Sequence, residues 1–121
     1  KEVSYIHAEA YQTSELKHGP LALINPEMPT VAIIPDDALA SRNLGAAEQV
    51  LARRGPLVAI THPGVDLSPL GVPAVVVPKN EPELDPILLT IPLQLLAYHA
   101  ALALGHDIDK PRNLAKSVTV E

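Results

Sequence analysis

Three short aliphatic runs without polar alternation most constrain what this chain can fold into. They are residues 30–34, 57–60 and 72–77. A strand with one face in water alternates apolar and polar residues, whereas a continuous β-branched run is typical of a strand buried on both faces. Between the first two runs, Leu44, Ala47 and Leu51 recur at the spacing of one helix face. Strand, helix and strand within about thirty residues predict a parallel α/β sheet with right-handed crossovers.

The ends of the helix between these runs have signals of their own. Asp36 and Asp37 precede it and are candidate caps for its first amide groups. Arg53 and Arg54 fall in its last turn, where cations are favourable. Gly55 follows and is expected to end the helix.

The beginning of the sequence also has a helical pattern. Val3, Ile6 and Ala10 are three and four residues apart, which predicts an amphipathic helix over residues 2–11. No strand run precedes this segment, and open sheets commonly have about four to six strands. We therefore expect the first strand and helix of the natural domain to lie upstream of Lys1.

Residues 87–104 carry no formal charge. A stretch of that length raises the question of a membrane span. Pro92, Gln94 and His99 lie inside it and charges flank both ends, so a buried core helix, kinked or restarted at Pro92, is the favoured interpretation.

Composition excludes several classes of function. Nine basic and fourteen acidic side chains leave a net charge of -5, which argues against a surface for nucleic acid or anionic membranes. The chain has no cysteine, so disulfides, Cys-ligated zinc, iron–sulfur clusters and thiol nucleophiles are excluded. The same absence is compatible with a cytosolic protein. With three Tyr and no Phe or Trp, aromatic stacking platforms are not expected.

Familiar catalytic motifs are missing from the sequence. Neither a dinucleotide fingerprint, a phosphate-binding loop nor a hydrolase nucleophile elbow occurs. A histidine–carboxylate metal site could be assembled from His7, Glu9, His18, Asp107 and Asp109. Their spacing is not that of a known zinc motif, so solvated polar residues are the favoured interpretation and no metal is expected.

Two polar segments have residue types suited to catalysis. Residues 15–20 combine an acid, a base and the His18 imidazole before Gly19 and Pro20, as either a polar turn or part of a site. In the tail, Lys116 lies four residues after Arg112. A nearby cation lowers the pKa of a lysine, as a Schiff-base nucleophile requires. A solvated terminal lysine is the alternative.

Four blocks of the sequence together resemble the glutamine–fructose-6-phosphate aminotransferase family, the glucosamine-6-phosphate synthases. The blocks are residues 1–11, 15–20, 92–99 and 111–121, the last reading PRNLAKSVTVE. The resemblance covers nearly the whole chain, and it implies an α/β fold of the sugar-isomerase, flavodoxin-like type. It further implies that residues 1–105 are the second half of such a domain, a partial three-layer parallel sheet of about three strands with flanking helices. Residues 106–121 would be a C-terminal catalytic tail.

The resemblance implies a reaction in which fructose 6-phosphate and glutamine give glucosamine 6-phosphate and glutamate, a step of amino-sugar biosynthesis. An N-terminal glutaminase domain would release the ammonia, and a first sugar-isomerase domain would hold the sugar phosphate. The expected assembly is a cytoplasmic homodimer, with no nucleic-acid or membrane partner. Because both other domains are outside this sequence, the chain alone is expected to be inactive. The open alternatives are a non-catalytic sugar-phosphate-binding module and a fructosamine-phosphate deglycase of the same fold.

The resemblance assigns roles to individual residues. Lys116 matches the lysine that forms a Schiff base with C2 of the open-chain sugar, and the backbone around Ala115 approaches the sugar. Glu2 matches the carboxylate that moves a proton between C1 and C2. His18 matches the imidazole that opens the sugar ring, acting in the neighbouring subunit. The imine supplies the electron sink, so no cofactor is expected.

Overall fold

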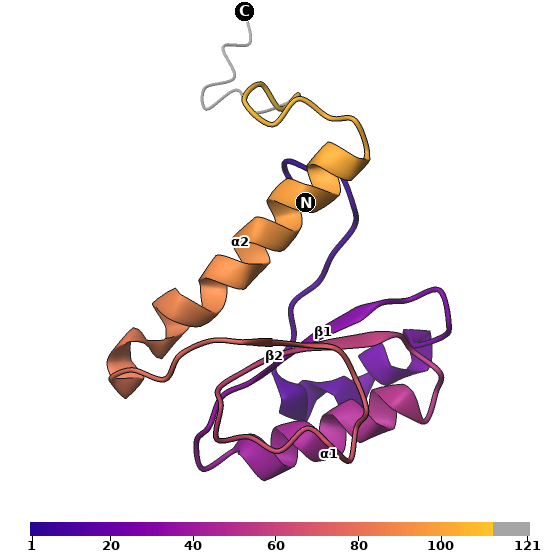
Figure 1. Ribbon diagram of the computed structural model, residues 1–121. Coiled ribbons are helices and arrows are strands. Elements are labelled where there is room, and N and C mark those ends of the chain that lie inside the picture. The colour runs from indigo at the N-terminus through magenta and orange to yellow at the C-terminus, as the bar shows by residue number, and fades with distance from the viewer. Residues whose placement is uncertain (113–121) are drawn as a thin grey trace, which may run out of the picture. The chain divides into compact units, whose positions relative to one another are not determined.

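The computed structural model describes residues 1–112. The chain divides into two compact units, one of residues 10–92 and one of residues 1–9 with those from 93 onward. Figure 1 labels the main elements along the chain. The domain boundary predicted between residues 105 and 106 stays a prediction.

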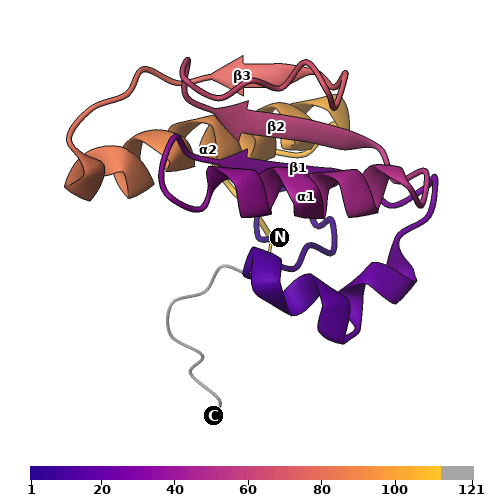
Figure 2. The same ribbon diagram turned by 90° about the horizontal axis from the view of Figure 1, so that it is seen from below.

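Residues 10–92 contain a sheet of three parallel strands in the order β1-β2-β3. The strands are β1 (Thr30–Ile34), β2 (Leu57–Thr61) and β3 (Ala74–Val76). Thr30 lies opposite Leu57, and Ala59 lies opposite Ala74. Figure 2 shows the strands side by side with α1 (Ala40–Leu51) along them. The predicted parallel α/β sheet is confirmed, and each strand lies within one or two residues of its predicted bounds.

The core of this unit lies between the sheet and α1. Its buried aliphatic residues come from both elements and from the loops around them: Leu21, Ile34, Ala47, Val50, Leu57, Ala59 and Leu70. Two short 3₁₀ helices, η1 (Thr13–His18) and η2 (Pro20–Leu23), supply Leu16 and Leu21 to it. The connection from β2 to β3 has no helix, so Leu70 and its neighbours fill the space that a crossover helix usually occupies.

The prediction that the strands are buried on both faces is wrong for β1 and β3. Val31 and Ile33 are 36% and 39% exposed, whereas Ile34 is fully buried. Successive side chains of a strand point to opposite faces, so the exposed pair shares the face away from α1. All of β3 is exposed. The aliphatic runs therefore mark one buried face and one apolar face that residues 10–92 leave largely open.

The two ends of α1 correct the predicted caps. Leu39 occupies the N-cap position without a side-chain hydrogen bond. Asp37 lies before the N-cap, and its carboxylate accepts the Leu39 N–H at 2.7 Å, which forms a turn that leads into the helix. At the other end Arg54 takes the left-handed conformation expected of Gly55, with φ 62°. Gly55 is needed for space, because a Cβ there would lie 2.5 Å from Cγ2 of Ile24.

The helix predicted over residues 2–11 is wrong. Residues 2–4 form a turn, and the chain from Tyr5 to Gln12 has no regular structure. Tyr5 has a φ of 56°, which a right-handed helix excludes, and its N–H donates to the Lys1 carbonyl at 2.8 Å. Helices shorter than about 12–15 residues are marginal without tertiary packing, and β-branched and aromatic residues weaken them further. Apolar spacing alone is insufficient to make this segment helical.

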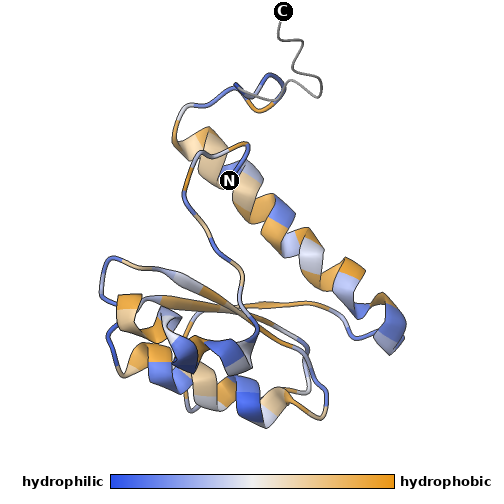
Figure 3. Cartoon of the chain, turned by 180° about the vertical axis from the view of Figure 1, so that it is seen from behind, coloured by the Kyte–Doolittle hydropathy of each residue, from blue (hydrophilic) through white to orange (hydrophobic). Residues whose placement is uncertain are grey.

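The long apolar helix is confirmed, but its predicted burial is wrong. A 3₁₀ turn, η3 (Pro82–Leu84), leads into α2 (Asp85–Ala103), which continues through Pro92 without a restart. Figure 3 shows apolar residues recurring along the whole length of α2. Leu95, Leu96 and Leu102 are about half exposed. By length and composition α2 could cross a membrane, a test that core helices of soluble proteins also pass.

Candidate functional site

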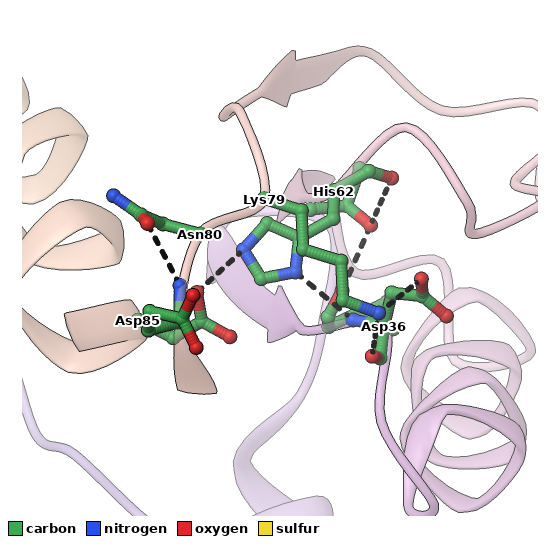
Figure 4. Close-up of polar contacts among 8 residues, drawn as sticks. Asp36, His62, Lys79, Asn80 and Asp85 are labelled. Carbon is green, nitrogen blue, oxygen red and sulfur yellow. Dashed lines mark hydrogen bonds and ion pairs between the residues drawn. The ribbon is translucent and has the colours of Figure 1, made fainter. Parts of the chain in front are cut away.

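The carboxyl ends of the three strands bring polar side chains together. We call Asp36, His62, Lys79 and Asp85 the strand-end cluster (Figure 4). Asp36 and His62 follow β1 and β2, Lys79 follows β3, and Asp85 opens α2. Parallel strands end at one edge of the sheet, which is where open α/β folds usually place their sites.

His62 is the buried centre of the strand-end cluster, with a side chain that is 0% exposed. Its Nδ1 accepts the backbone N–H of Asp36 at 3.1 Å, so the ring proton belongs on Nε2. Nε2 lies 3.6 Å from Oδ1 of Asp85, too far for a hydrogen bond, and neither atom has another partner among the described residues. The pair connects the end of β2 to the first turn of α2.

Asp36 and Lys79 form the exposed side of the strand-end cluster. The Lys79 ammonium donates to the Asp36 carboxylate at 2.7 Å and to the Asp36 carbonyl at 3.0 Å. This hydrogen bond and the lysine charge lower the pKa of the Asp36 carboxyl below its ordinary value. A Cβ on Gly64 would lie 2.5 Å from Oδ2 of Asp36, so glycine lets the loop after β2 approach the carboxylate.

The strand-end cluster holds elements together. Thr61 adds a buried hydroxyl that donates to the Ile34 carbonyl at 2.8 Å and ties β2 to β1. The charged groups of the strand-end cluster face one another. Within residues 1–112 no three His, Asp or Glu side chains are grouped to hold a metal ion. The geometry therefore fits an anchor for the start of α2.

A second polar group surrounds Tyr5 in the other unit. The backbone N–H of Arg112 donates to the Tyr5 hydroxyl at 2.7 Å. The guanidinium carbon of Arg112 lies 4.2 Å from the centre of the Tyr5 ring, and the His106 ring lies 4.7 Å away, edge to face. We call Tyr5, His106 and Arg112 the tyrosine clamp.

The residues predicted from the sequence to be catalytic lie outside the strand-end cluster. Glu2 is exposed in the turn over residues 2–4, in the same unit as the tyrosine clamp. His18 is exposed at the end of η1, in the unit of residues 10–92. Ala115 and Lys116 lie outside the described residues. Their predicted roles stay predictions.

The fold and sequence together define the class of protein. The SIS domain family model matches residues 1–104, and the chain belongs to the SIS domain family. Among curated relatives, the glutamine--fructose-6-phosphate aminotransferase [isomerizing] of Legionella pneumophila (strain Lens) is 51% identical over 121 residues, all of this chain and 20% of the relative. The enzyme of that name from Xanthomonas campestris pv. campestris is 52% identical over 122 residues, again 20% of its length.

A solved structure gives the same result in three dimensions. The C-terminal domain of glucosamine-fructose-6-phosphate aminotransferase from Francisella tularensis matches with a TM-score of 0.83 and 41% identity. The match covers 91% of this chain and 31% of that one. The resemblance predicted from the four sequence blocks is thus confirmed. The chain spans about a fifth of the length of the curated relatives it matches.

Sequence reasoning missed the strand-end cluster and the tyrosine clamp. A signal for the first was available, because Asp36 and His62 each follow a predicted strand by one or two residues. Polar residues at that point of a parallel sheet share an edge. The tyrosine clamp had no such signal, because Tyr5 and Arg112 are 107 positions apart.

Proposed function

We propose that this chain is the C-terminal portion of the isomerase part of an enzyme that makes glucosamine 6-phosphate from fructose 6-phosphate and ammonia taken from glutamine. One observation carries the proposal. Relatives that bear the name of this enzyme match the chain over its whole length at 51–52% identity. Because the chain spans a fifth of those relatives, a glutaminase domain and a first sugar-isomerase domain belong to the proposal, as do a homodimer and a cytoplasmic location.

The proposed chemistry begins at Lys116. Its neutral amine adds to the C2 carbonyl of the open-chain sugar, and the hydroxyl so formed takes up a proton and leaves as water, which gives a protonated imine. The product carries its amino group on C2, so ammonia must then replace the lysine amine on that carbon. The positive imine attracts electrons from the C1–H bond and makes the C1 proton acidic. No step requires a metal or an organic cofactor.

Two further residues move protons in the proposal. Glu2 takes the proton from C1 and returns it to C2, so that C1 becomes the aldehyde and C2 keeps the amine. His18 moves the proton that opens the sugar ring, as imidazoles commonly do near neutral pH. Both side chains are exposed, so both are open to a substrate that arrives from outside the chain.

The experiment is a lysine substitution in the full-length enzyme. Lys116→Arg keeps the positive charge and removes the nucleophilic amine. We expect glucosamine 6-phosphate formation to fall at least about 10³-fold, since covalent catalysis is lost, while glutamine hydrolysis continues. Lys110→Arg, the same change six residues earlier, is the control and retains synthesis. Normal synthesis by Lys116→Arg would contradict the proposal.

The two proton-transfer roles are separated by a substrate analogue that is already open-chain. Glu2→Gln should lower C1–C2 proton exchange at least about 10²-fold with either substrate. His18→Ala should be slow with the cyclic sugar and partly recover with the open-chain analogue. Equal recovery of both variants would show that the division of roles is wrong.

Residues 1–121 alone are proposed to form no product.

A further inference from the structure

Tyr5 has a backbone conformation that needs an explanation. Its φ of 56° lies in the left-handed region, which residues other than glycine and asparagine rarely adopt. The Tyr5 N–H donates to the Lys1 carbonyl at 2.8 Å and closes a turn that contains Glu2. A strained residue persists only where its surroundings fix it, so the contacts of the Tyr5 side chain carry the explanation.

The side chain of Tyr5 makes three contacts within the tyrosine clamp. The phenol oxygen accepts the Arg112 N–H at 2.7 Å. The Arg112 guanidinium lies over the ring face at 4.2 Å from its centre, a cation–π arrangement. His106 meets the ring with an interplanar angle of 61°. One side chain thus fixes two points of the segment after α2 to the turn at the start of the chain.

The two segments joined by the tyrosine clamp are those that carry proposed catalytic residues. Glu2 precedes Tyr5 by three residues, and Lys116 follows Arg112 by four. Four residues of fully extended chain reach at most about 14 Å. Fixing Arg112 against Tyr5 therefore fixes, beside the Glu2 turn, the point from which the chain toward Lys116 starts.

We propose that Tyr5 is a positioning residue, which holds the start of the Lys116 tail beside the Glu2 turn. The inference rests on the proposed function and deepens it. Tyr5 acts through Glu2 and Lys116. Its benefit is orientation: a nucleophile and a base that start from fixed neighbouring points react faster, and a displacement of about 1 Å can cost about 10²-fold.

A purely structural role predicts a different result. Tyr5 is half-buried, and its hydrogen bond to Arg112 is exposed, so the tyrosine clamp adds little to a hydrophobic core. Removing it should leave most molecules folded. A structural defect would reduce the number of working sites, whereas a positioning defect would reduce the rate at each site.

The experiment measures those two quantities separately in the full-length enzyme. Fructose 6-phosphate is mixed with enzyme, borohydride traps the imine on Lys116, and mass spectrometry follows its rate and final yield. The variants are Tyr5→Ala, which removes all three contacts, and Tyr5→Phe, which keeps the ring and removes the hydroxyl. Tyr98→Phe makes the same change at a tyrosine that is 45% exposed and contacts His99 instead.

We expect Tyr5→Ala to lower the trapping rate about 10- to 100-fold with an unchanged final yield. Synthesis should show lower kcat and a nearly unchanged KM for the sugar, because a positioning residue changes the rate of reaction after the sugar has bound. Tyr5→Phe should fall between Tyr5→Ala and the parent, and Tyr98→Phe should match the parent. A parental trapping rate in Tyr5→Ala, or a lower yield at the parental rate, would overturn the inference.

Two checks keep the result decisive. If Tyr5→Ala does not fold, Arg112→Gln and Tyr5→Phe replace it, each about threefold slower than the parent. In the double variant the fold-loss in trapping rate should differ from the product of the two single fold-losses, because both residues act in one contact. A double loss equal to that product would overturn the inference. If the parent forms its imine on a residue other than Lys116, the proposed function fails first. A parental imine on Lys116 that Tyr5→Ala leaves unaffected overturns the inference alone.

Discussion

The two units of the chain are stabilised in different ways. In residues 10–92 a continuous aliphatic core joins the sheet to α1, and the polar strand-end cluster lies at the edge of that sheet. In residues 1–9 and 93–112 the part of α2 after Pro92 keeps much of its apolar surface exposed, and the tyrosine clamp joins segments far apart in sequence.

The comparison distinguishes the surfaces that this chain buries within itself from the surfaces that it leaves open to other parts of a protein. A core of interlocking aliphatic residues needs no further partner on its buried side. The apolar surface of α2 and the open face of β1 are of the kind that usually marks contact with other protein. The relatives are about five times longer than the chain.

The largest expected effect tests the two faces of β1 with neighbouring isoleucines. Ile34 is 0% exposed and Ile33 is 39% exposed. We expect Ile34→Ala to lower the free energy of unfolding by about 4 kcal/mol, from lost burial and the cavity left behind. Ile33→Ala should cost less than half as much. Urea unfolding measures both, and equal losses would contradict the one-sided core.

The next effect tests the buried pair of the strand-end cluster. His62→Ala should cost about 3 kcal/mol, because it removes a fully buried ring and leaves the Asp36 N–H without its acceptor. The double variant with Asp85→Ala should lose less than the sum of the two single losses, because the two side chains face each other at 3.6 Å. Additive losses in a thermal or urea double-mutant cycle would show that the two side chains are independent.

Alanine substitutions at two glycines should give smaller effects on stability, opposite in sign to each other. An alanine Cβ at position 55 would lie 2.5 Å from Ile24 and 3.0 Å from Val50, so Gly55→Ala should cost about 2 kcal/mol through overpacking. Gly45 lies inside α1, where an added Cβ would meet no atom of a neighbouring group within 4 Å. Gly45→Ala should stabilise by about 0.5–1 kcal/mol through helix propensity. Stabilisation by both changes would contradict the close packing at position 55.

The smallest effect is the pH dependence of the exposed Asp36–Lys79 pair. The pKa of the Asp36 carboxyl is lower in the folded chain than in the unfolded one, because of Lys79. The folded state then binds fewer protons, so the pair stabilises above about pH 4 and loses its effect as pH falls through the folded pKa. Unfolding midpoints of the parent and Asp36→Asn should differ at pH 7 and converge toward pH 3. A difference that persists in acid would exclude this charge as its cause.

Much of residues 10–92 was predictable from sequence because periodicity and local propensity set it. The strand runs, the α1 stripe and the end of that helix near Gly55 all follow from residues close together in the chain. The prediction failed where local signals compete with longer-range contacts. Tyr5 takes a left-handed turn within a helix-like pattern, and its partner lies at position 112.

The roles proposed for Glu2 and His18 rest on resemblance alone. Neither the exposed Glu2 nor the exposed His18 has a local pattern that identifies it as catalytic. The burial of His62 depended on pairing between β1 and β2, which brings it under the Asp36 amide. Burial and pairing of this kind arise from tertiary structure, which no window of sequence displays.

One measurement tests the central claim most directly. The full-length enzyme is incubated with fructose 6-phosphate and borohydride, digested, and searched by mass spectrometry for a lysine that carries the reduced sugar phosphate. The account predicts one adduct, on Lys116, which Lys116→Arg abolishes while glutamine hydrolysis continues. An adduct on Lys110 or another lysine, or synthesis without any adduct, would contradict it.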